Sequence, residues 1–463
     1  MIPPDLLLAV SAEGGGQLSI VIGAGCSLQA PTAIPLAKNL SLEAHRRLVK
    51  DGVLDADECA NPEDLAALAT LVFTKTGSQE SLVRRLPIDR LRMARPNDGY
   101  KLLVAMMAEG VISHVLSLNF DLAIENAASE LGFILSVSSH HGQLIPVHAA
   151  LVHLHGSVNN VSNELVLRQE TIDNDWKASW QQVVAQQVLA APNILFAGLG
   201  SAAPVLSETV EMIRIALGGQ KAFYQADVNA HGVNYFAQHL NVAANHYIQT
   251  DWCDAMRRLS NRVVDEQVES LLSNGSALLN ANGFDDEEVE EFKDVASRLK
   301  AVSLVALGKF RARARLTGVS SYVPRSLADE EWMAMPLLTL AKVCKKTGLG
   351  PSAVQNGLWL LNENGRIKAT ILVATGKGTR KLGALESAIK DMCREIGESS
   401  VAPPDVVLVG GVVPDVAPTN AAAPLDIVEG DEAGDIISGP QTPLVVIAES
   451  AAAVTQMEEW LHD

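Results

Sequence analysis

Several common features are scarce in this 463-residue chain, and each shortage excludes a class of protein. Aromatic residues make up only 4 % of the sequence although 48 % of it is hydrophobic, which predicts aliphatic cores of the kind found in layered α/β proteins. No run reaches the roughly 18 apolar residues of a membrane span, and the apolar stretch 6–10 is too short for a signal core. We therefore expect a soluble cytoplasmic protein that does not bind a membrane.

Cysteine and positive charge are also limited. The five cysteines are scattered and form no Cys-x-x-Cys pair, which excludes a zinc ribbon and a disulfide framework and predicts free thiols in a reducing compartment. With 36 basic and 54 acidic residues, the net charge of −18 argues against a chain whose main task is to grip nucleic acid. A local basic patch would still permit direct nucleic-acid binding, but we do not favour it.

The most informative stretch that is present covers residues 18–27. Its first five residues are mostly apolar and branched, which predicts a buried parallel strand over 18–22. The strand runs into Gly23, Ala24 and Gly25, and a glycine turn at the carboxyl end of a strand offers bare backbone N–H groups to phosphate. The spacing matches neither a P-loop nor the full Gly-x-Gly-x-x-Gly fingerprint, so a plain tight turn explains this stretch alone nearly as well.

A second apolar stretch ends in two polar residues. The strand predicted over 111–121 carries Asn119 and Asp121 at its end, and residues at i and i+2 of a strand point to the same side. A helix is expected over 122–131, so Asp121 could equally be its N-cap.

The strand predicted over 151–157 carries His153 and His155. Without further ligands at suitable spacing, two histidines do not predict a zinc site. We interpret His153 as a hydrogen-bonded core residue. His155 is next to the glycine turn, where a histidine makes a good general base because its ordinary pKa lies near neutral pH.

A fourth unit repeats the arrangement. A strand over 193–197 runs into Gly198, Gly200 and Ser201, and a later strand ends at Asp227. Strands and helices alternate through residue 250, which predicts a doubly wound parallel sheet of the Rossmann-like α/β class.

Together the four stretches resemble the sirtuin-like NAD-consuming fold over roughly residues 15 to 260. The hallmarks of that family stand here as Gly23-Ala24-Gly25-Cys26-Ser27, Ile34-Pro35, Asn119-Phe120-Asp121, His155-Gly156-Ser157 and Gly198-Leu199-Gly200-Ser201. The resemblance implies that NAD is a substrate, that no metal takes part, and that Asn119 and His155 form the catalytic pair with Asp121 orienting them. The residues it implies for cofactor binding are Gly23, Ala24, Gly25, Ser27, Pro35, Gly198, Gly200, Ser201 and Asp227.

Two departures from the family pattern guide the choice of activity. Sirtuin deacylases insert a four-cysteine zinc ribbon that this chain lacks, and the zinc-less branch resembles bacterial anti-phage defence effectors that hydrolyse NAD in abortive infection. The family often carries Asp in the turn after the fourth strand, where this sequence has Ala203-Pro204. The leading expectation is an NAD glycohydrolase. The alternatives are a module that senses NAD or ADP-ribose without cleaving it, and a zinc-free deacylase or ADP-ribosyltransferase.

The pattern changes in the second half. A polar break is expected over 270–274 and 280–283, followed by an acidic helix start over 285–294. The basic run 309–315 is expected to pair with those acids or with a neighbouring subunit. A helix, a second helix over 352–361 and a strand from 367 together predict a winged-helix-like outline, and a small α/β region follows it.

We therefore expect three parts: a catalytic domain over 1–262, a helical connector over 263–330 and a winged-helix-like plus small α/β domain of unknown role over 331–463. The expected partners are NAD, further copies of the chain in a homo-oligomer, and a protein of the same defence system that activates the enzyme.

Overall fold

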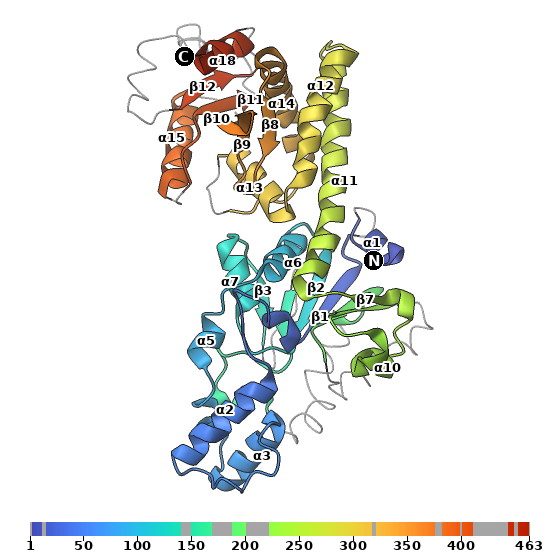
Figure 1. Cartoon of the computed structure of the whole chain (residues 1–463), viewed down its shortest axis with the longest axis vertical. Helices are drawn as coiled ribbons and strands as arrows, with labels where there is room; N and C mark the ends of the chain where they lie inside the picture. The colour runs from blue at the N-terminus through green and yellow to red at the C-terminus, as the bar shows by residue number, and fades with distance from the viewer. Residues whose placement is uncertain are drawn as a thin grey trace. The chain divides into compact units, whose positions relative to one another are not determined.

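The computed structural model describes residues 2–11, 15–139, 150–168, 188–200, 222–316, 321–375, 382–398, 401–410, 443–448 and 452–462. Two compact units are present, Met1–Arg262 and Val263–Asp463 (Figure 1). Ser201 and the turn that carries Ala203 and Pro204 lie outside the described residues. No helix in the described ranges is long and apolar enough to span a lipid bilayer.

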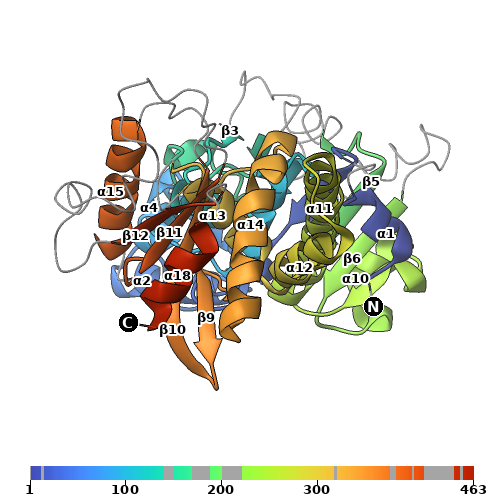
Figure 2. The same ribbon diagram turned by 90° about the horizontal axis from the view of Figure 1, so that it is seen from above.

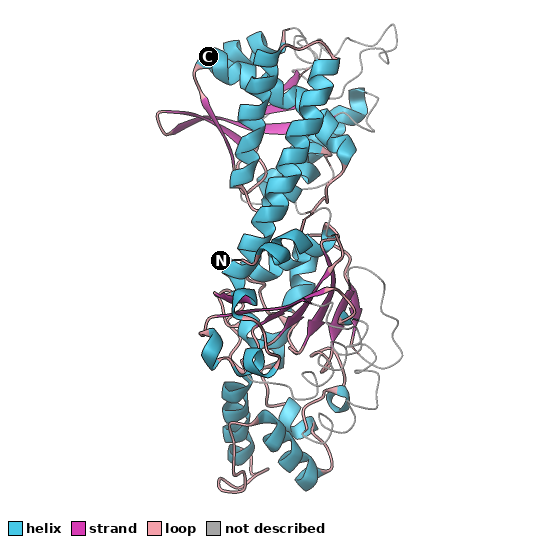
Figure 3. Ribbon diagram, turned by 90° about the vertical axis from the view of Figure 1, so that its right-hand side faces the viewer, coloured by secondary structure: helices cyan, strands magenta, loops and turns pink. Residues whose placement is uncertain are grey.

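The first unit is built on a seven-stranded sheet in which every neighbouring pair is parallel. Its strand order is β3-β4-β2-β1-β5-β6-β7, and the sheet is flanked by helices (Figure 3). This confirms the doubly wound, Rossmann-like sheet that the alternating pattern predicted. The strands are β1 (Leu18–Ile22), β2 (Ile112–Ser117), β3 (Ser136–Ser138), β4 (Ala150–His153), β5 (Asn193–Ala197), β6 (Ala222–Asp227) and β7 (Tyr247–Gln249).

The central strands are buried on both faces, as aliphatic runs in a parallel sheet must be. All five residues of β1 are buried, and Val21 shares one hydrophobic cluster with Leu116, Val152 and Phe196 of neighbouring strands. The helices of this unit include α2 (Ala37–Lys50), α3 (Leu65–Thr76), α6 (Asp98–Ala108), α7 (Ala123–Glu130) and α10 (Tyr235–His239). Helices α2 and α3 pack together in a separate hydrophobic cluster.

Strand register brings the carboxyl ends of the central strands level with one another. Ile22 at the end of β1 pairs with Ser117 of β2 and with Ala197 of β5, and Ser117 pairs in turn with His153 of β4. The chain enters β2 on one side of β1 and β5 on the other, so β1 and β5 flank the point where the strand order reverses. Ligands of open α/β sheets bind at such a point.

The second unit contains a five-stranded sheet in the order β12-β11-β10-β9-β8. Strands β10 (Arg366–Thr375), β11 (Val406–Gly410) and β12 (Leu444–Ile447) are parallel, whereas β8 (Gly350–Ala353) and β9 (Trp359–Glu363) form an antiparallel edge. Helix α15 (Leu382–Glu398) covers one face, and α14 (Leu327–Thr347) and α18 (Ala453–His462) lie on the other (Figure 2). The remaining helices are α11 (Trp252–Ala281), α12 (Asp286–Ser297) and α13 (Leu304–Ala314).

Two expectations for this half are wrong. Residues 352–361 form no helix, because strands β8 and β9 occupy this stretch and turn at Gly357 with φ +82°. Burial along β9 alternates with the two-residue period of a strand. The described residues therefore show no winged-helix outline, although the small α/β arrangement is confirmed. Of the expected polar break, residues 280–283 coincide with the end of α11 at Ala281, but residues 270–274 lie inside that helix, where Ser270 and Asn274 donate hydrogen bonds to the buried Glu330 carboxylate at 2.9 and 2.7 Å.

The acidic start of α12 is confirmed, and Asp285 caps it through a reciprocal capping box with Glu288. Two of its charges pair with α14, since Lys342 contacts Glu288 and Lys345 contacts Glu287, each at 2.6 Å. Pairing of the basic run 309–315 with the acidic start or with a neighbouring subunit stays a prediction.

A glycine inside α11 tests how tightly the second unit is packed. An alanine at Gly275 would gain about 1 kcal/mol of helix propensity, but its Cβ would lie 2.4 Å from Cζ of the fully buried Phe292. Overpacking of this kind costs about 1–3 kcal/mol. We expect Gly275→Ala to lower the free energy of unfolding in urea. The double variant with Phe292→Leu should be more stable than the two single losses added together, and a stabilising Gly275→Ala would contradict this packing.

Candidate active site

The candidate site lies at the carboxyl edge of the first sheet, where four loops leave level strand ends. Gly23 follows β1, Asn119 comes two residues after β2, His155 two residues after β4, and Gly198 directly after β5. Because these strand ends are in register, motifs up to 175 positions apart in the sequence reach one edge of the sheet.

The first and fourth glycine turns pack directly on each other. Gly23 N–H donates to the carbonyl of Ala197 at 2.9 Å, and Gly25 N–H donates to that of Gly198 at 3.0 Å. Gly198 has φ +67°, and a Cβ there would lie 2.5 Å from the backbone nitrogen of Cys26. The sequence suggested that these two N–H groups are bare, but the structure shows that both are hydrogen-bonded and hold the two turns together. Position 198 requires glycine because its backbone is left-handed and because a side chain would have no space.

The side chain of Asn119 is buried under the first turn, with 7 % of its surface exposed. Its Nδ2 donates to the carbonyl of Gly23 and to Ser27 Oγ, both at 3.2 Å. A carbonyl can only accept, so the contact with Gly23 fixes which end of the amide is nitrogen. The amide oxygen accepts no hydrogen bond from the described residues, and it remains available for a donor on a ligand.

Asp121 terminates a directed chain of hydrogen bonds. Ser27 Oγ–H donates to Asp121 Oδ2 at 2.9 Å, and because that hydroxyl has only one hydrogen, Tyr100 O–H must donate to Ser27 at 2.7 Å. The other carboxylate oxygen accepts from Ala123 N–H at 3.1 Å, in the manner of a helix cap. Burial raises the pKa of Asp121, while the bonds from Ser27 and Ala123 act in the opposite direction. The N-cap of α7 is Leu122, so Asp121 is not the cap that the sequence allowed; it accepts the first N–H of that helix and also anchors the first glycine turn.

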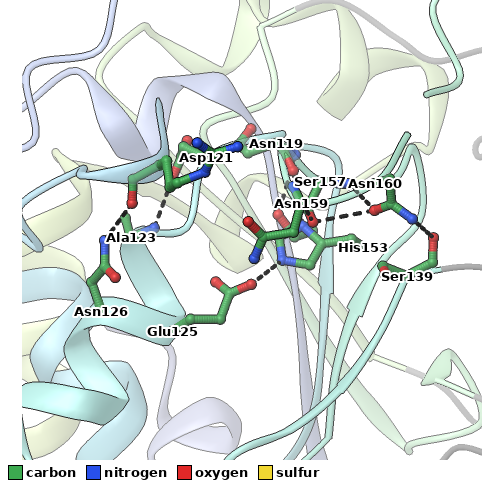
Figure 4. Close-up of polar contacts among 12 residues, drawn as sticks. Asn119, Asp121, Ala123, Glu125, Asn126, Ser139, His153, Ser157, Asn159 and Asn160 are labelled. Atoms are coloured by element: carbon green, nitrogen blue, oxygen red, sulfur yellow. Dashed lines mark hydrogen bonds and ion pairs between the residues drawn. The ribbon is translucent and has the colours of Figure 1, made fainter. Parts of the chain in front are cut away.

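His153 is a buried, charged link between two elements, with 1 % exposure. Its Nδ1 lies 3.0 Å from the carbonyl oxygen of Asn119 and its Nε2 lies 2.8 Å from Glu125 Oε1 (Figure 4). Both partners are acceptors, so the ring donates through both nitrogens and carries a positive charge. Burial alone would lower the pKa of His153, but the charge and hydrogen bond of Glu125 outweigh it and raise the pKa.

Because its pKa is raised, His153 should stabilise the fold in a way that depends on pH. A histidine whose folded pKa lies above its unfolded value of about 6.5 stabilises the fold below that pH, and the contribution is lost as the pH rises through the folded pKa. We expect His153→Gln to cost about 3 kcal/mol or more at pH 6, because it leaves Glu125 without its cation. The cost, measured by urea unfolding at several pH values, should shrink towards pH 9. A cost independent of pH would contradict the charged state.

His155 differs sharply from His153. Its Nδ1 faces the carbonyl of Leu118 at 3.3 Å, so this nitrogen carries the hydrogen and Nε2 is the basic atom. Burial lowers the pKa of His155 to about 4, although the bond to Leu118 acts in the opposite direction. The ring is therefore neutral at physiological pH, which a proton acceptor requires. The structure places the ring beside Phe120, with centroids 6.3 Å apart.

The other predicted residues are less closely joined. Ile34 N–H donates to the carbonyl of Ser27 at 2.9 Å, which ties the segment containing Pro35 to the first turn. Ala24 lies in the short 3-10 helix Ala24–Ser27 of that turn. Asp227 ends β6 and accepts a hydrogen bond from Asn229 N–H at 2.8 Å. Among the described residues, no hydrogen bond joins Asp227 to Asn119. A Cβ at Gly200 would meet no atom of the described residues within 4 Å, so their packing does not require glycine there.

Sequence reasoning missed Tyr100 and Glu125. Tyr100 is fully buried on α6, and Glu125 lies in the first turn of α7. Neither stands in a motif, and each follows a helical pattern that indicates packing or solvation, so no local signal identified them. Among the described residues, no group of three or more His, Cys, Asp or Glu side chains could hold a metal ion.

No family model and no curated protein matches this chain. Similar solved structures include a mutant Sir2 homologue in complex with 2′-O-acetyl-ADP-ribose, at 18 % identity, with 56 % of this chain and 95 % of that chain covered and a TM-score of 0.36. Another is a Sir2 homologue–NAD complex at 18 % identity, covering 56 % of this chain and 93 % of that one, with a TM-score of 0.34. Similarity this low leaves the fold class to rest on the strand order and the site on its own geometry.

Proposed function

We propose that this chain is an NAD hydrolase that cleaves NAD to nicotinamide and ADP-ribose at the carboxyl edge of the first sheet. The observation that carries the proposal is the amide of Asn119, held by Gly23 and Ser27 so that its oxygen is available at the point where the strand order reverses. His155, neutral and basic at Nε2, leaves the same edge two residues after β4.

The reaction makes modest demands on the protein. The bond between nicotinamide and the ribose carbon breaks, nicotinamide leaves as a neutral molecule, and a water oxygen bonds to that carbon and releases one proton. No strong nucleophile is required. The protein must hold the dinucleotide, orient one water or ribose hydroxyl and accept the proton.

The residues of the site divide these tasks. The Asn119 amide oxygen accepts a hydrogen bond from a ribose hydroxyl or from the attacking water, and His155 takes the proton. Asp121, through Ser27, holds the first glycine turn in place, and the resemblance of the sequence assigns that turn to the pyrophosphate. His153 fixes the backbone carbonyl of Asn119 and so keeps the amide in position.

The biological setting is a further part of the proposal and rests on the sequence resemblance. We expect an anti-phage defence effector of the cytoplasm that acts as a homo-oligomer and stays inactive until a partner protein or a ligand reaches the second unit. Three parts are proposed for the chain, with catalysis in residues 1–262.

A second candidate is a module that binds NAD or ADP-ribose without cleaving it. It is favoured by Ala203, which stands where the related NAD-hydrolysing effectors often carry an acid. Binding without cleavage would leave the dinucleotide intact after long incubation with the full chain.

The deciding experiment uses the full chain, NAD and water enriched in ¹⁸O, with and without candidate activators. Hydrolysis predicts equal amounts of nicotinamide and ADP-ribose, and one ¹⁸O atom in each ADP-ribose formed. Nicotinamide release without labelled ADP-ribose, together with a mass increase on protein, would instead indicate an ADP-ribosyltransferase. Intact NAD under every condition would overturn the hydrolase proposal.

A further inference from the structure

The second unit contains a buried arginine, Arg313, that has no counterion among the described residues. Arg313 lies near the end of α13 with 2 % of its surface exposed, and its Nε and Nη1 atoms make no hydrogen bond. Burial lowers the pKa of Arg313 to about 10, and no acidic group of the described chain counteracts it. A guanidinium stays charged under all ordinary conditions, so such a group is costly unless an anion reaches it.

The position of Arg313 is that of a ligand site in other α/β sheets. The carbonyl of the next residue, Ala314, accepts a hydrogen bond at 3.1 Å from Thr375 Oγ1, and Thr375 is the last residue of β10. Strand β10 belongs to the parallel set β10, β11 and β12. Arg313 is therefore close to the carboxyl edge of this second sheet, the edge at which open α/β sheets bind ligands.

A second unpaired donor lies on the neighbouring strand. Trp359 of β9 is fully buried, and its Nε1–H has no acceptor. Its ring packs against Phe310 with centroids 5.8 Å apart, and Phe310 precedes Arg313 by one turn of α13. Buried donors normally have partners. Arg313 and Trp359 are thus two buried donors without a partner among the described residues, on elements that pack together through Phe310.

We propose that Arg313 forms an anion site in the second unit that binds the carboxylate group of a small molecule. One guanidinium carries one positive charge, so a group with a single negative charge neutralises it, whereas a phosphate monoester carries about −1.5 to −2 and would leave excess charge buried. A carboxylate also matches the planar fork of arginine. The proposal does not depend on NAD cleavage in the first unit.

The test compares the melting temperature of the full chain in sodium acetate or formate with that in sodium chloride of the same ionic strength. We expect either carboxylate to raise the melting temperature of the wild type by about 2–4 °C, and inorganic phosphate to raise it less. Arg313→Met should abolish the rise. Arg394→Met, which removes an exposed arginine of the same unit that pairs with Asp391, should keep it.

The melting temperature of Arg313→Met without a carboxylate tests whether Arg313 only stabilises the fold. Without a carboxylate present, Arg313→Met should melt no lower than the wild type, because a methionine removes an uncompensated buried charge at similar volume. An equal carboxylate effect in wild type and Arg313→Met, no effect of any carboxylate on the wild type, or a lower melting temperature of Arg313→Met in chloride would each overturn the proposal.

Discussion

Replacing His155 with alanine should reduce NAD cleavage by about a hundredfold or more, since a positioned general base contributes on the order of 10² to 10⁴ to the rate. The pKa of about 4 implies that the wild-type ring accepts a proton at any pH above that value. Cleavage should therefore persist in mildly acidic solution and decline as the pH falls towards 4. Nicotinamide release, followed from pH 4 to 9, measures both effects.

Asn119→Ala should produce a loss of similar size for a different reason. It removes the amide oxygen that would contact ribose or water, and it also removes one of the donors to the carbonyl of Gly23 and to the hydroxyl of Ser27, which keep Cys26 N–H and Tyr100 O–H respectively. His153→Ala is the matched control, because it should lower stability more than it lowers turnover per folded molecule. If a folded His153→Ala protein is inactive while His155→Ala is active, the two histidine roles are reversed.

The second large effect is expected on stability. In Gly198→Ala, the left-handed backbone costs about 1–2 kcal/mol, and the added Cβ meets Cys26 N at 2.5 Å and Gly23 O at 2.9 Å. Neither atom belongs to a flexible side chain, so a backbone shift is required and adds about 1–3 kcal/mol. Urea unfolding should show a total loss of about 3 kcal/mol, and NAD affinity should fall with it because the same turns are displaced.

Gly200→Ala provides the control at the same loop, two residues further on. A Cβ at this position meets nothing within 4 Å in the part of the chain that the structure describes, so its effect on stability should stay within about 0.5 kcal/mol. Equal losses in both variants would show that the two glycine turns are not locked in the way that Gly23 and Gly25 indicate.

The first sheet could be predicted well because its signals are local. The strands expected over 18–22 and 193–197 match β1 and β5 residue for residue, since each is an apolar run that ends at glycine. The strands predicted over 111–121 and 151–157, which carry Asn119 and His155, were predicted too long. Strand β2 ends at Ser117 and β4 at His153, so the catalytic candidates lie in the loops beyond.

The residues that could not be predicted from the sequence have roles that depend on contacts between elements far apart in the chain. Tyr100 reaches Ser27 across 73 positions, and Glu125 reaches His153 across 28, yet both lie on helices with ordinary patterns. The second unit was misread for the same reason. Ser270 and Asn274 indicate a loop when read locally, but their polarity serves Glu330, some 60 positions away.

The most direct test of the central claim is a time course of nicotinamide release by purified full-length protein, in the presence of its activator, beside Asn119→Ala and His155→Ala at equal folded concentration. We expect steady nicotinamide release by the wild type and about a hundredfold less, or none, by either variant. Release by both variants at the wild-type rate would contradict a site at the carboxyl edge of the first sheet.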